Sequence, residues 1–334
     1  MLRDLEVSPI GIGTMGFSHG YGEVPGEEYT IEAIREAYEF GATFIDTAEV
    51  YGREMFYPGH NEEMVGKAIE PFRDEVVLAT KFFLEREEYG EEVTIYDAIR
   101  KHLDGSLEKL RTDYVDLYYW HRVNEEIPVE DVAEVMGQLI EEGVIKGWGM
   151  SQVSVEYLDR AHQVTPVSAV QSVYSMVERG AEEDVIPYCL ENNIGFVPFS
   201  PIASGLLSGK VTKETKFEGD DVRKFVPQLS DKNIDANQPI IDLIAKYADD
   251  KGATNAQISM AWMLHKYPNV VPITGSKNKG RIIENLGAWN VELTDEEFEK
   301  LESELEKLPV HGHRGHVETQ QRGWAEKQKA EGKE

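Results

Sequence analysis

The sequence is poor in cysteine, and that scarcity limits both its chemistry and its location. Cys189 is the only cysteine among the 334 residues, so no disulfide can form within the chain. A chain without disulfides is typical of a reducing compartment, and we expect a cytoplasmic protein. Because Cys189 lies in the helical stretch PYCLENN, the sequence predicts a small buried side chain rather than a reactive thiol.

The sequence also lacks the long apolar segments that membrane insertion requires. No apolar run reaches the ~20 residues needed to span a bilayer. The first residues, MLRDLEVSPIGIG, contain no apolar core of the kind found in signal peptides. We therefore expect no membrane partner.

Basic residues are scarce as well. The chain has 34 Lys and Arg against 62 Asp and Glu, a formal net charge of −28. Such an excess of negative charge argues against nucleic acid or an anionic membrane as a partner. We expect a small-molecule ligand and a monomer or weak homo-oligomer. An anionic ligand would need positive groups concentrated locally.

Eight short apolar runs, separated by amphipathic helical stretches, extend through the chain. Each run is apolar enough to be a parallel strand buried on both faces. The runs are VSPIGIG, TFIDT, VVLATK, VDLYYWH, VIKGWGMS, SAVQSV, GFVPFS and VVPITG. Eight strand–helix units favour a closed (β/α)8 TIM barrel over an open doubly wound sheet.

The segments outside these units complete the predicted architecture. Residues 208–236 lack a strong pattern and are interpreted as a loop over the barrel mouth. Thr294 and Glu297 form a capping box before an extra C-terminal helix that packs outside the barrel. We expect one catalytic barrel domain over residues 1–310, followed by a C-terminal loop or tail over 311–334.

Four ionisable residues follow the predicted strands. Asp46, Lys81 and His121 end the second, third and fourth strands, and Tyr51 lies five residues beyond Asp46. Active sites of such barrels lie at the carboxyl ends of the strands. Carbonyl reduction needs an acid, and an ammonium group near a tyrosine lowers its pKa from the ordinary ~10. The pattern predicts Tyr51 as proton donor, tuned by Lys81 and Asp46, with His121 orienting the substrate oxygen.

These residues lie in segments that resemble the aldo-keto reductase family over nearly the whole chain. The matching segments are FIDTAEVYG, LATK, LYYWHR, GWGMS, AVQSVY, FSPIASG and PITGSKNKGRIIENLGA. The family's catalytic tetrad corresponds to Asp46, Tyr51, Lys81 and His121. The resemblance implies a (β/α)8 fold and NADP(H)-dependent reduction of aldehydes or ketones without a metal.

The segment PITGSKNKGRIIENLGA supplies the positive charge that an anionic cofactor needs. A strand there leads through a turn into a helix, and helix N-termini favour phosphate. By resemblance, Ser276, Lys277 and Arg281 bind the 2′-phosphate of NADPH, and Glu284 and Asn285 bind adenine; Asn278 belongs to the same cluster. The remaining positions that correspond to cofactor-binding residues of the family are Ser151, Gln152, Gln171, Phe199, Ser200, Ile202, Ser204 and Gly205.

Residues near the strand ends are candidates for the substrate pocket. They are Met15, Phe17, Tyr21, Phe82, Trp120 and Tyr174. Their aromatic character favours an apolar or stacking substrate, although each could equally pack in the core. Gln152, where many family members have asparagine, and Trp120, which is bulkier than expected and would narrow or reshape the pocket, depart from the family.

Other interpretations of the sequence remain to be weighed. GIGTMG is a literal G-x-G-x-x-G, but no helix follows it directly, so a Rossmann fingerprint is disfavoured. A nicotinamide-sensing subunit is one alternative function. A metal-dependent hydrolase is another, although the first strand lacks the H-x-H common in such barrels. His311, His313 and His316 could bind a metal, but their spacing matches no recognised site.

Overall fold

The computed structural model describes residues 1–315 of the chain. Eight strands, all paired in parallel, form one sheet in the order β7-β6-β5-β4-β3-β2-β1-β8. The strands are β1 Gly11–Gly13, β2 Phe44–Asp46, β3 Val77–Phe82, β4 Val115–Trp120, β5 Ile145–Ser151, β6 Ala169–Val173, β7 Gly195–Phe199 and β8 Ile273–Gly275.

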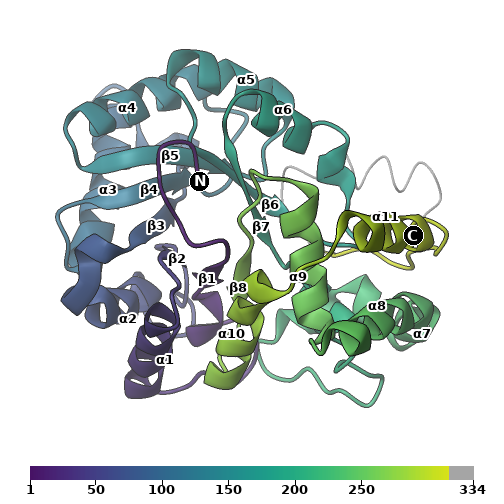
Figure 1. Ribbon diagram of the computed structural model, residues 1–334. Coiled ribbons are helices and arrows are strands. Elements are labelled where there is room, and N and C mark those ends of the chain that lie inside the picture. The colour runs from purple at the N-terminus through teal and green to yellow at the C-terminus, as the bar shows by residue number, and fades with distance from the viewer. Residues whose placement is uncertain (316–334) are drawn as a thin grey trace.

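Backbone hydrogen bonds close this sheet into a barrel. The N–H of Phe196 in β7 donates to the carbonyl of Asn269 at 2.8 Å, and the N–H of Val271 donates back to Phe196 at 2.8 Å. The segment leading into β8 therefore pairs with β7, and both edges of the sheet are satisfied. Helices surround the strands, as Figure 1 shows. The predicted (β/α)8 barrel is confirmed.

Helices alternate with the strands from start to finish. The α-helices are α1 Glu27–Glu39, α2 His60–Ile69, α3 Ile95–Leu110, α4 Val129–Glu141, α5 Val155–Val164, α6 Val185–Glu191, α7 Asp231–Ala236, α8 Gln238–Lys251, α9 Asn255–Lys266, α10 Lys279–Leu286 and α11 Asp295–Leu305. The predicted capping box is present at α11, where the Thr294 side chain accepts from the N–H of Glu297 and the Glu297 carboxylate accepts from the N–H of Thr294.

The two-residue period of the strands decides which side chains enter the barrel. In β4, Leu117 and Tyr119 belong to the small cluster inside the barrel, whereas Tyr118 and Trp120 belong to the large cluster between the barrel and the helices. Successive side chains of a strand point to opposite faces. His121, the next residue along, therefore has the inward orientation of Tyr119.

Leu2 closes the end of the barrel opposite to the strand ends that carry the site. It belongs to the inner cluster and is fully buried. A Cβ on Gly195, at the start of β7, would lie 2.4 Å from the Leu2 side chain. The first residues of the chain thus plug this end of the barrel.

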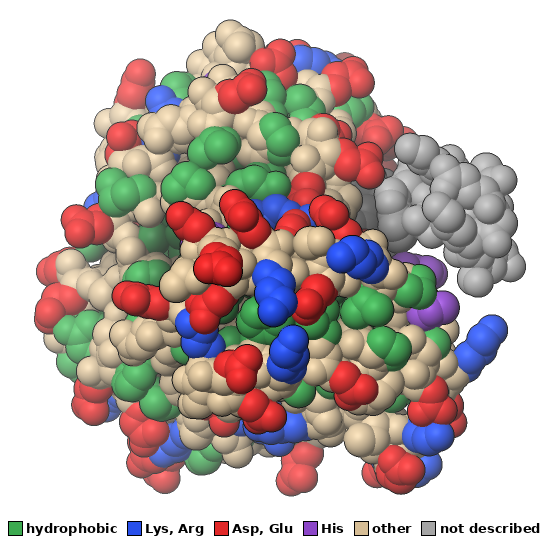
Figure 2. All heavy atoms as spheres, turned by 45° about the vertical axis from the view of Figure 1, so that its right-hand side comes forward, with side chains coloured by type: hydrophobic (Ala, Val, Ile, Leu, Met, Phe, Trp, Pro, Cys, Tyr) green, Lys and Arg blue, Asp and Glu red, His purple; other side chains and the backbone are tan. Residues whose placement is uncertain are grey.

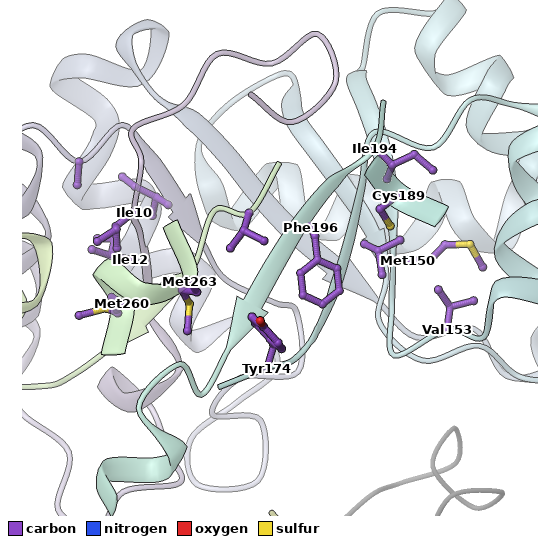
Figure 3. Packing of buried hydrophobic residues seen from close by; sticks show 14 of the residues in the cluster. Ile10, Ile12, Met150, Val153, Tyr174, Cys189, Ile194, Phe196, Met260 and Met263 are labelled. Carbon is purple, nitrogen blue, oxygen red and sulfur yellow. The ribbon is translucent and has the colours of Figure 1, made fainter. Parts of the chain in front are cut away.

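The outer layer carries most of the apolar packing. Figure 3 shows Tyr174 and Phe196 there, and Met260 and Met263 of α9 beside the strands. The ring centroids of Tyr174 and Phe196 are 5.9 Å apart. Cys189 of α6 is fully buried in the same layer, and burial raises the pKa of its thiol to about 12. A thiol in this state is a packing group, as the sequence predicts.

Acidic and basic side chains are interspersed on the surface (Figure 2). On the face drawn in Figure 2, carboxylates are scattered among Lys and Arg side chains rather than gathered into one patch. In the part of the chain that the structure describes, we find no helix with the length and apolar character needed to cross a membrane.

The region predicted as one loop over the mouth is more structured than expected. It contains the 3-10 helices Val222–Phe225 and Pro227–Leu229 before α7. Its Asp220 carboxylate accepts from the N–H groups of Gly20 and Gly22, at 2.6 and 3.0 Å. The β7 loop is thereby joined to the β1 loop across the mouth.

Candidate active site

The four ionisable residues predicted from the strand ends come together at one end of the barrel. Asp46 ends β2, Lys81 is the fifth residue of β3, and His121 follows the last residue of β4. Their inward orientation has the same origin as that of Tyr119, because each shares the parity of the inward-facing residues on its strand. Tyr51 joins them from the β2–α2 loop.

Lys81 is the centre of this group. Its Nζ atom donates to Asp46 Oδ1, to the carbonyl of Thr47 at 2.7 Å and to the phenolic oxygen of Tyr51 at 3.3 Å. Lys81 and Asp46 are 0% and 1% exposed. Asp46 Oδ2 also accepts from Gln171 Nε2 at 2.8 Å. All three donor positions of the ammonium are therefore used, and one points at the tyrosine.

The electrostatics correct one expectation. Burial raises the pKa of Tyr51 above its ordinary value, and Lys81 lowers it by a smaller amount. The predicted net lowering is therefore wrong for the protein without ligands. Burial also opposes the charge of Lys81, but Asp46 and Tyr51 outweigh that effect, so the pKa of Lys81 is raised and the ammonium stays charged.

His121 is present as the neutral imidazole. Burial, aided by the positive charges of Arg122 and Lys81, holds its pKa well below the ordinary value. The ring lies edge-on to Tyr51, with centroids 5.9 Å apart, and 4.6 Å from the ring of Phe83. A neutral imidazole in this position can donate one hydrogen bond without adding a charge.

Asn61 of α2, which the sequence did not single out, holds the surrounding loops. Its Oδ1 accepts from the hydroxyls of Thr14 and Thr47, each at 2.6 Å, and its Nδ2 donates to Thr14 O and Ser18 Oγ. Thr47 is the residue whose carbonyl receives Lys81. This fully buried amide thus fixes the loop that carries Tyr51.

A cavity of about 910 Å³ opens above the four residues. Asp46, Tyr51 and His121 line it at the barrel end, and Ser276, Lys277 and Arg281 line it at the far end. A volume of this size is large enough for a cofactor together with a small substrate.

Four of the six candidate pocket residues do not line this cavity. Met15 and Tyr21 do, but Phe17, Phe82, Trp120 and Tyr174 are buried in the layer between barrel and helices. Phe82, Trp120 and Tyr174 follow the inward-facing Lys81, Tyr119 and Val173 by one residue. They must therefore point outward, which removes both their pocket role and the expected narrowing by Trp120.

Phe83 is an aromatic residue beside His121 that faces the cavity. It lines the cavity, as do His19, Arg122 and Arg314, and none of these was singled out from the sequence. The ring of His19 lies 5.5 Å from that of Tyr51. The sequence does carry a signal for Phe83. Counted from the inward-facing Lys81, the two-residue period of β3 places Phe83, and not Phe82, on the inner face.

Most predicted cofactor residues also line the cavity. They are Ser151, Gln171, Phe199, Ser200, Ile202, Ser204, Gly205, Ser276, Lys277, Arg281, Glu284 and Asn285. Gln152 and Asn278 do not line it. Asn278 instead caps α10, with its Oδ1 accepting from the N–H of Arg281 at 3.0 Å, so it shapes the helix N-terminus rather than facing the cavity.

The turn after β7 is strained in the manner of a ligand-binding turn. Ala203, Ser204 and Gly205 follow one another with φ values of 49°, 56° and 100°. Residues other than glycine adopt such angles at a cost of about 1–3 kcal/mol, usually at functional sites. Ser204 Oγ is buried and has no hydrogen-bond partner among residues 1–315. An orphaned hydroxyl on this turn fits an anionic group that would occupy the cavity.

The α10 end of the cavity is held by Lys277. Its Nζ donates to the carbonyl of Tyr21 at 2.8 Å and to that of Glu23. Asn285 is buried and donates to Thr274 Oγ1 at 2.8 Å. The capped N-terminus of α10, with Lys277 and Arg281 beside it, supplies the local positive charge expected for an anionic cofactor.

The three histidines near the C-terminal end lie only partly within the described residues. His311 and His313 lie within the described residues, and His316 lies outside them. Over residues 1–315, no group of three or more His, Cys, Asp and Glu side chains is placed to hold a metal ion.

Comparison with known proteins gives consistent matches. The sequence profile of the Aldo/keto reductase family matches residues 9–306. A probable aldo-keto reductase 1 of Glycine max is 34% identical over 312 residues, which cover 92% of this chain and 87% of that protein.

The chain is also similar to solved structures of oxidoreductases. A glycerol dehydrogenase from Gluconobacter oxydans superposes with a TM-score of 0.80 at 27% identity, covering 92% of this chain and 95% of that one. An aldo/keto reductase from Klebsiella pneumoniae, solved in complex with NADP and acetate, gives 0.70 at 28% identity, covering 93% and 95%.

Proposed function

The chain belongs to the aldo/keto reductase family, and on that premise we propose that it reduces aldehydes or ketones to alcohols with NADPH, using Tyr51 as the general acid. One observation carries the proposal. The buried ammonium of Lys81 contacts both Asp46 and the Tyr51 hydroxyl at the base of an open cavity.

The residues of the cavity fit a phosphorylated nicotinamide cofactor, which supplies the hydride for the carbonyl carbon when bound. Lys277 and Arg281, at the capped N-terminus of α10, would hold its 2′-phosphate. The strained turn with the unpartnered Ser204 hydroxyl would face its pyrophosphate. Ser151 and Gln171 would meet the carboxamide, and Phe199 would stack on the ring.

The chain's own residues handle the proton. Tyr51 is protonated at neutral pH, since its ordinary pKa of ~10 is raised further by burial, and its hydroxyl can donate to the substrate oxygen. The phenolate left behind lies 3.3 Å from Lys81 Nζ, and this ammonium stabilises it. Asp46 keeps Lys81 charged and in place.

His121 orients the substrate. Because its imidazole is neutral and buried beside Tyr51, it can donate a hydrogen bond to the same oxygen without repelling Lys81. The barrel plug at Leu2 and the burial of Lys81 exclude water from the proton-donating side. In the oxidation direction the same groups would accept the proton of an alcohol.

The test measures the consumption of NADPH in the presence of para-nitrobenzaldehyde. The reaction is monitored through the loss of the cofactor's near-ultraviolet absorbance. We expect turnover with NADPH well above that with NADH. Tyr51→Phe should lower kcat by about 10²–10⁴-fold, the usual contribution of a general acid, with unchanged NADPH affinity.

Tyr57→Phe is the matched control. Tyr57 lies in the same loop, but its hydroxyl is exposed and donates to Glu63, so its removal should leave kcat within twofold. Wild-type turnover by Tyr51→Phe would contradict the mechanism. Tight NADPH binding without turnover on a broad panel of carbonyls would instead favour a nicotinamide-sensing protein.

A further inference from the structure

After α11 the chain returns to the barrel mouth and is held there by specific hydrogen bonds. Asn237, which is fully buried, donates through Nδ2 to the carbonyl of His311 and accepts through Oδ1 from its N–H, both at 2.9 Å. The N–H of Gln228 donates to the carbonyl of His313 at 3.2 Å. Residues 311–315 therefore follow a defined path over the segment 225–237.

Two glycines permit this path. Gly312 and Gly315 have φ values of 76° and 73°, which favour glycine. A Cβ at Gly312 would lie 2.7 Å from Asn233 Nδ2, and one at Gly315 would lie 2.7 Å from Pro227 Cδ. The backbone of the segment is in close contact with the loop beneath it, with Arg314 between the two glycines.

The path directs Arg314 into the cavity. Its backbone N–H donates to Glu178 Oε2 at 3.2 Å, and its side-chain Nε donates to Ser200 Oγ at 3.3 Å. Arg314 lines the same cavity as Tyr51 and the cofactor residues. Within residues 1–315, its two Nη nitrogens have no hydrogen-bond partner, so the outer edge of the guanidinium is available to a ligand.

The surroundings leave the charge of Arg314 largely uncompensated. Burial raises the pKa of Glu178 to about 7, even though the Arg314 backbone and charge lower it, so this carboxyl is partly protonated at neutral pH. Arg223, by contrast, is paired with Asp221 through Nε and Nη2, and Lys210 with Glu284. Arg314 thus differs from Arg223 and Lys210, which line the same cavity, in lacking an ion-pair partner among residues 1–315.

We propose that Arg314 is an anion-binding residue of the cavity, which uses its Nη groups to bind a phosphate or carboxylate oxygen of a molecule bound beside Ser200. A guanidinium presents two parallel N–H donors that match such oxygens in a bidentate arrangement. The proposal rests on the proposed function for the identity of that molecule. The oxygen belongs either to the pyrophosphate of the cofactor or to an acidic group on the carbonyl substrate.

The test compares wild type with Arg314→Gln and Arg314→Lys. The dissociation constant of NADP⁺ is measured by quenching of tryptophan fluorescence. Binding and KM are measured for para-carboxybenzaldehyde and for its uncharged methyl ester. Arg160→Gln is the control, because Arg160 pairs with Glu130 away from the cavity and should change none of these values.

Each source of the anion gives its own result. If the oxygen belongs to the cofactor, Arg314→Gln should weaken NADP⁺ binding by about 10-fold and affect both aldehydes alike. If it belongs to the substrate, NADP⁺ binding should be unchanged and the preference for the acid over its ester should fall by about 10-fold. Arg314→Lys, which keeps the charge, should recover part of either loss.

A change below twofold in both quantities, in a variant with an unchanged melting temperature, would overturn the proposal. Arg314→Gln could also lower the melting temperature. In that case the proposal is still supported if Arg314→Lys restores binding but not the melting temperature. If Arg314→Lys restores both together, the proposal is contradicted. If wild type shows no reductase turnover, the proposed function fails, but the two equilibrium binding arms still decide the role of Arg314.

Discussion

The Nζ atom of Lys81 lies 3.3 Å from the phenolic oxygen of Tyr51, although the two residues are 30 positions apart in the sequence. The same ammonium contacts Asp46, and both charged groups are buried. If Tyr51 is the proton donor, as proposed, this arrangement joins catalysis to stability, because a change that affects the proton donor also affects a buried ion pair.

Replacing Lys81 should reduce both activity and stability. In Lys81→Met the phenolate formed on proton transfer loses its stabilising charge, and we expect kcat to fall by roughly 10²-fold or more. Asp46 is left buried without its charged partner, at a cost of about 3–5 kcal/mol. The free energy of unfolding should fall most at high pH, because burial raises the pKa of Asp46 and its ionisation is then resisted by the fold.

The double variant Asp46→Asn with Lys81→Met is the control for this prediction. It removes the buried charge, so it should unfold with more difficulty than Lys81→Met alone while remaining inactive. Chemical denaturation at two pH values checks both statements. Equal free energies of unfolding for the single and double variants would show that losing Lys81 does not leave a destabilising charge on Asp46.

Glu62 should make the protein less stable as the pH rises. This carboxyl of α2 is buried, and burial raises its pKa from the ordinary 4.5 to about 7, although Thr80 Oγ1 donates to it at 2.6 Å. The folded state keeps the proton while the unfolded state loses it, so the free energy of unfolding decreases between about pH 4.5 and 7. Glu62→Gln should remove this decrease, on the order of 2–3 kcal/mol, as seen by denaturation across that range.

Its neighbour Glu63 provides a control of opposite sign. Hydrogen bonds from Lys67 and Tyr57 lower the pKa of Glu63, so its ionised form stabilises the fold. That contribution is present above the ordinary carboxyl pKa and is lost as the pH falls through the lowered value. Glu63→Gln should therefore reduce stability at neutral pH, whereas a gain there would contradict the lowered pKa of Glu63.

Arg281 should determine the choice between NADPH and NADH. It lies exposed in the first turn of α10 and lines the cavity, and its guanidinium has no ion-pair partner among residues 1–315. If it binds the 2′-phosphate, Arg281→Leu should raise KM for NADPH by about 10-fold or more and leave KM for NADH within twofold. Steady-state kinetics with both cofactors check this expectation.

Lys279 tests whether the position of the charge matters. It lies in the same helical turn, but its ammonium already pairs with Glu32 and Glu36. Lys279→Leu should therefore preserve the preference for NADPH. A loss of preference equal to that of Arg281→Leu would indicate a general effect of charge at this end of the cavity.

Gly149 should not tolerate even a methyl group. A Cβ there would lie 2.5 Å from the Ala169 carbonyl and 2.5 Å from the Tyr119 ring, inside the barrel. We expect Gly149→Ala to lower the free energy of unfolding by about 1–3 kcal/mol. A Cβ at Gly105, within α3, would meet nothing within 4 Å, so Gly105→Ala should raise it by about 0.5–1 kcal/mol through helix propensity. Thermal melting of the two variants should shift in opposite directions.

Much of the fold follows from local pattern. The eight apolar runs predicted eight strands, and the capping residues Thr294 and Asn278 lie where sequence rules place helix starts. Strand parity, counted from Lys81 and His121, also indicates that Phe82 and Trp120 face outward. The pocket prediction for these two, which rested on their aromatic character, was wrong because strand parity places both on the outer face of the barrel.

Other features depend on contacts that local pattern does not encode. Asn61 joins Thr14 and Thr47, which are 47 and 14 positions away, and Arg314 meets Ser200 across 114 positions. The pKa of Tyr51 also could not be foreseen, because the sequence reveals its cationic neighbour but not the depth of its burial.

The sequence by itself determined the barrel, the rim on which Asp46, Lys81 and His121 lie, and the charged start of α10, since these depend on periodicity and on residue order along each strand. Only the tertiary structure decided which side chains line the cavity, how far burial shifts their protonation, and that the C-terminal segment brings Arg314 to the mouth. Those properties arise from the packing of distant segments and from exclusion of water, which no local pattern specifies.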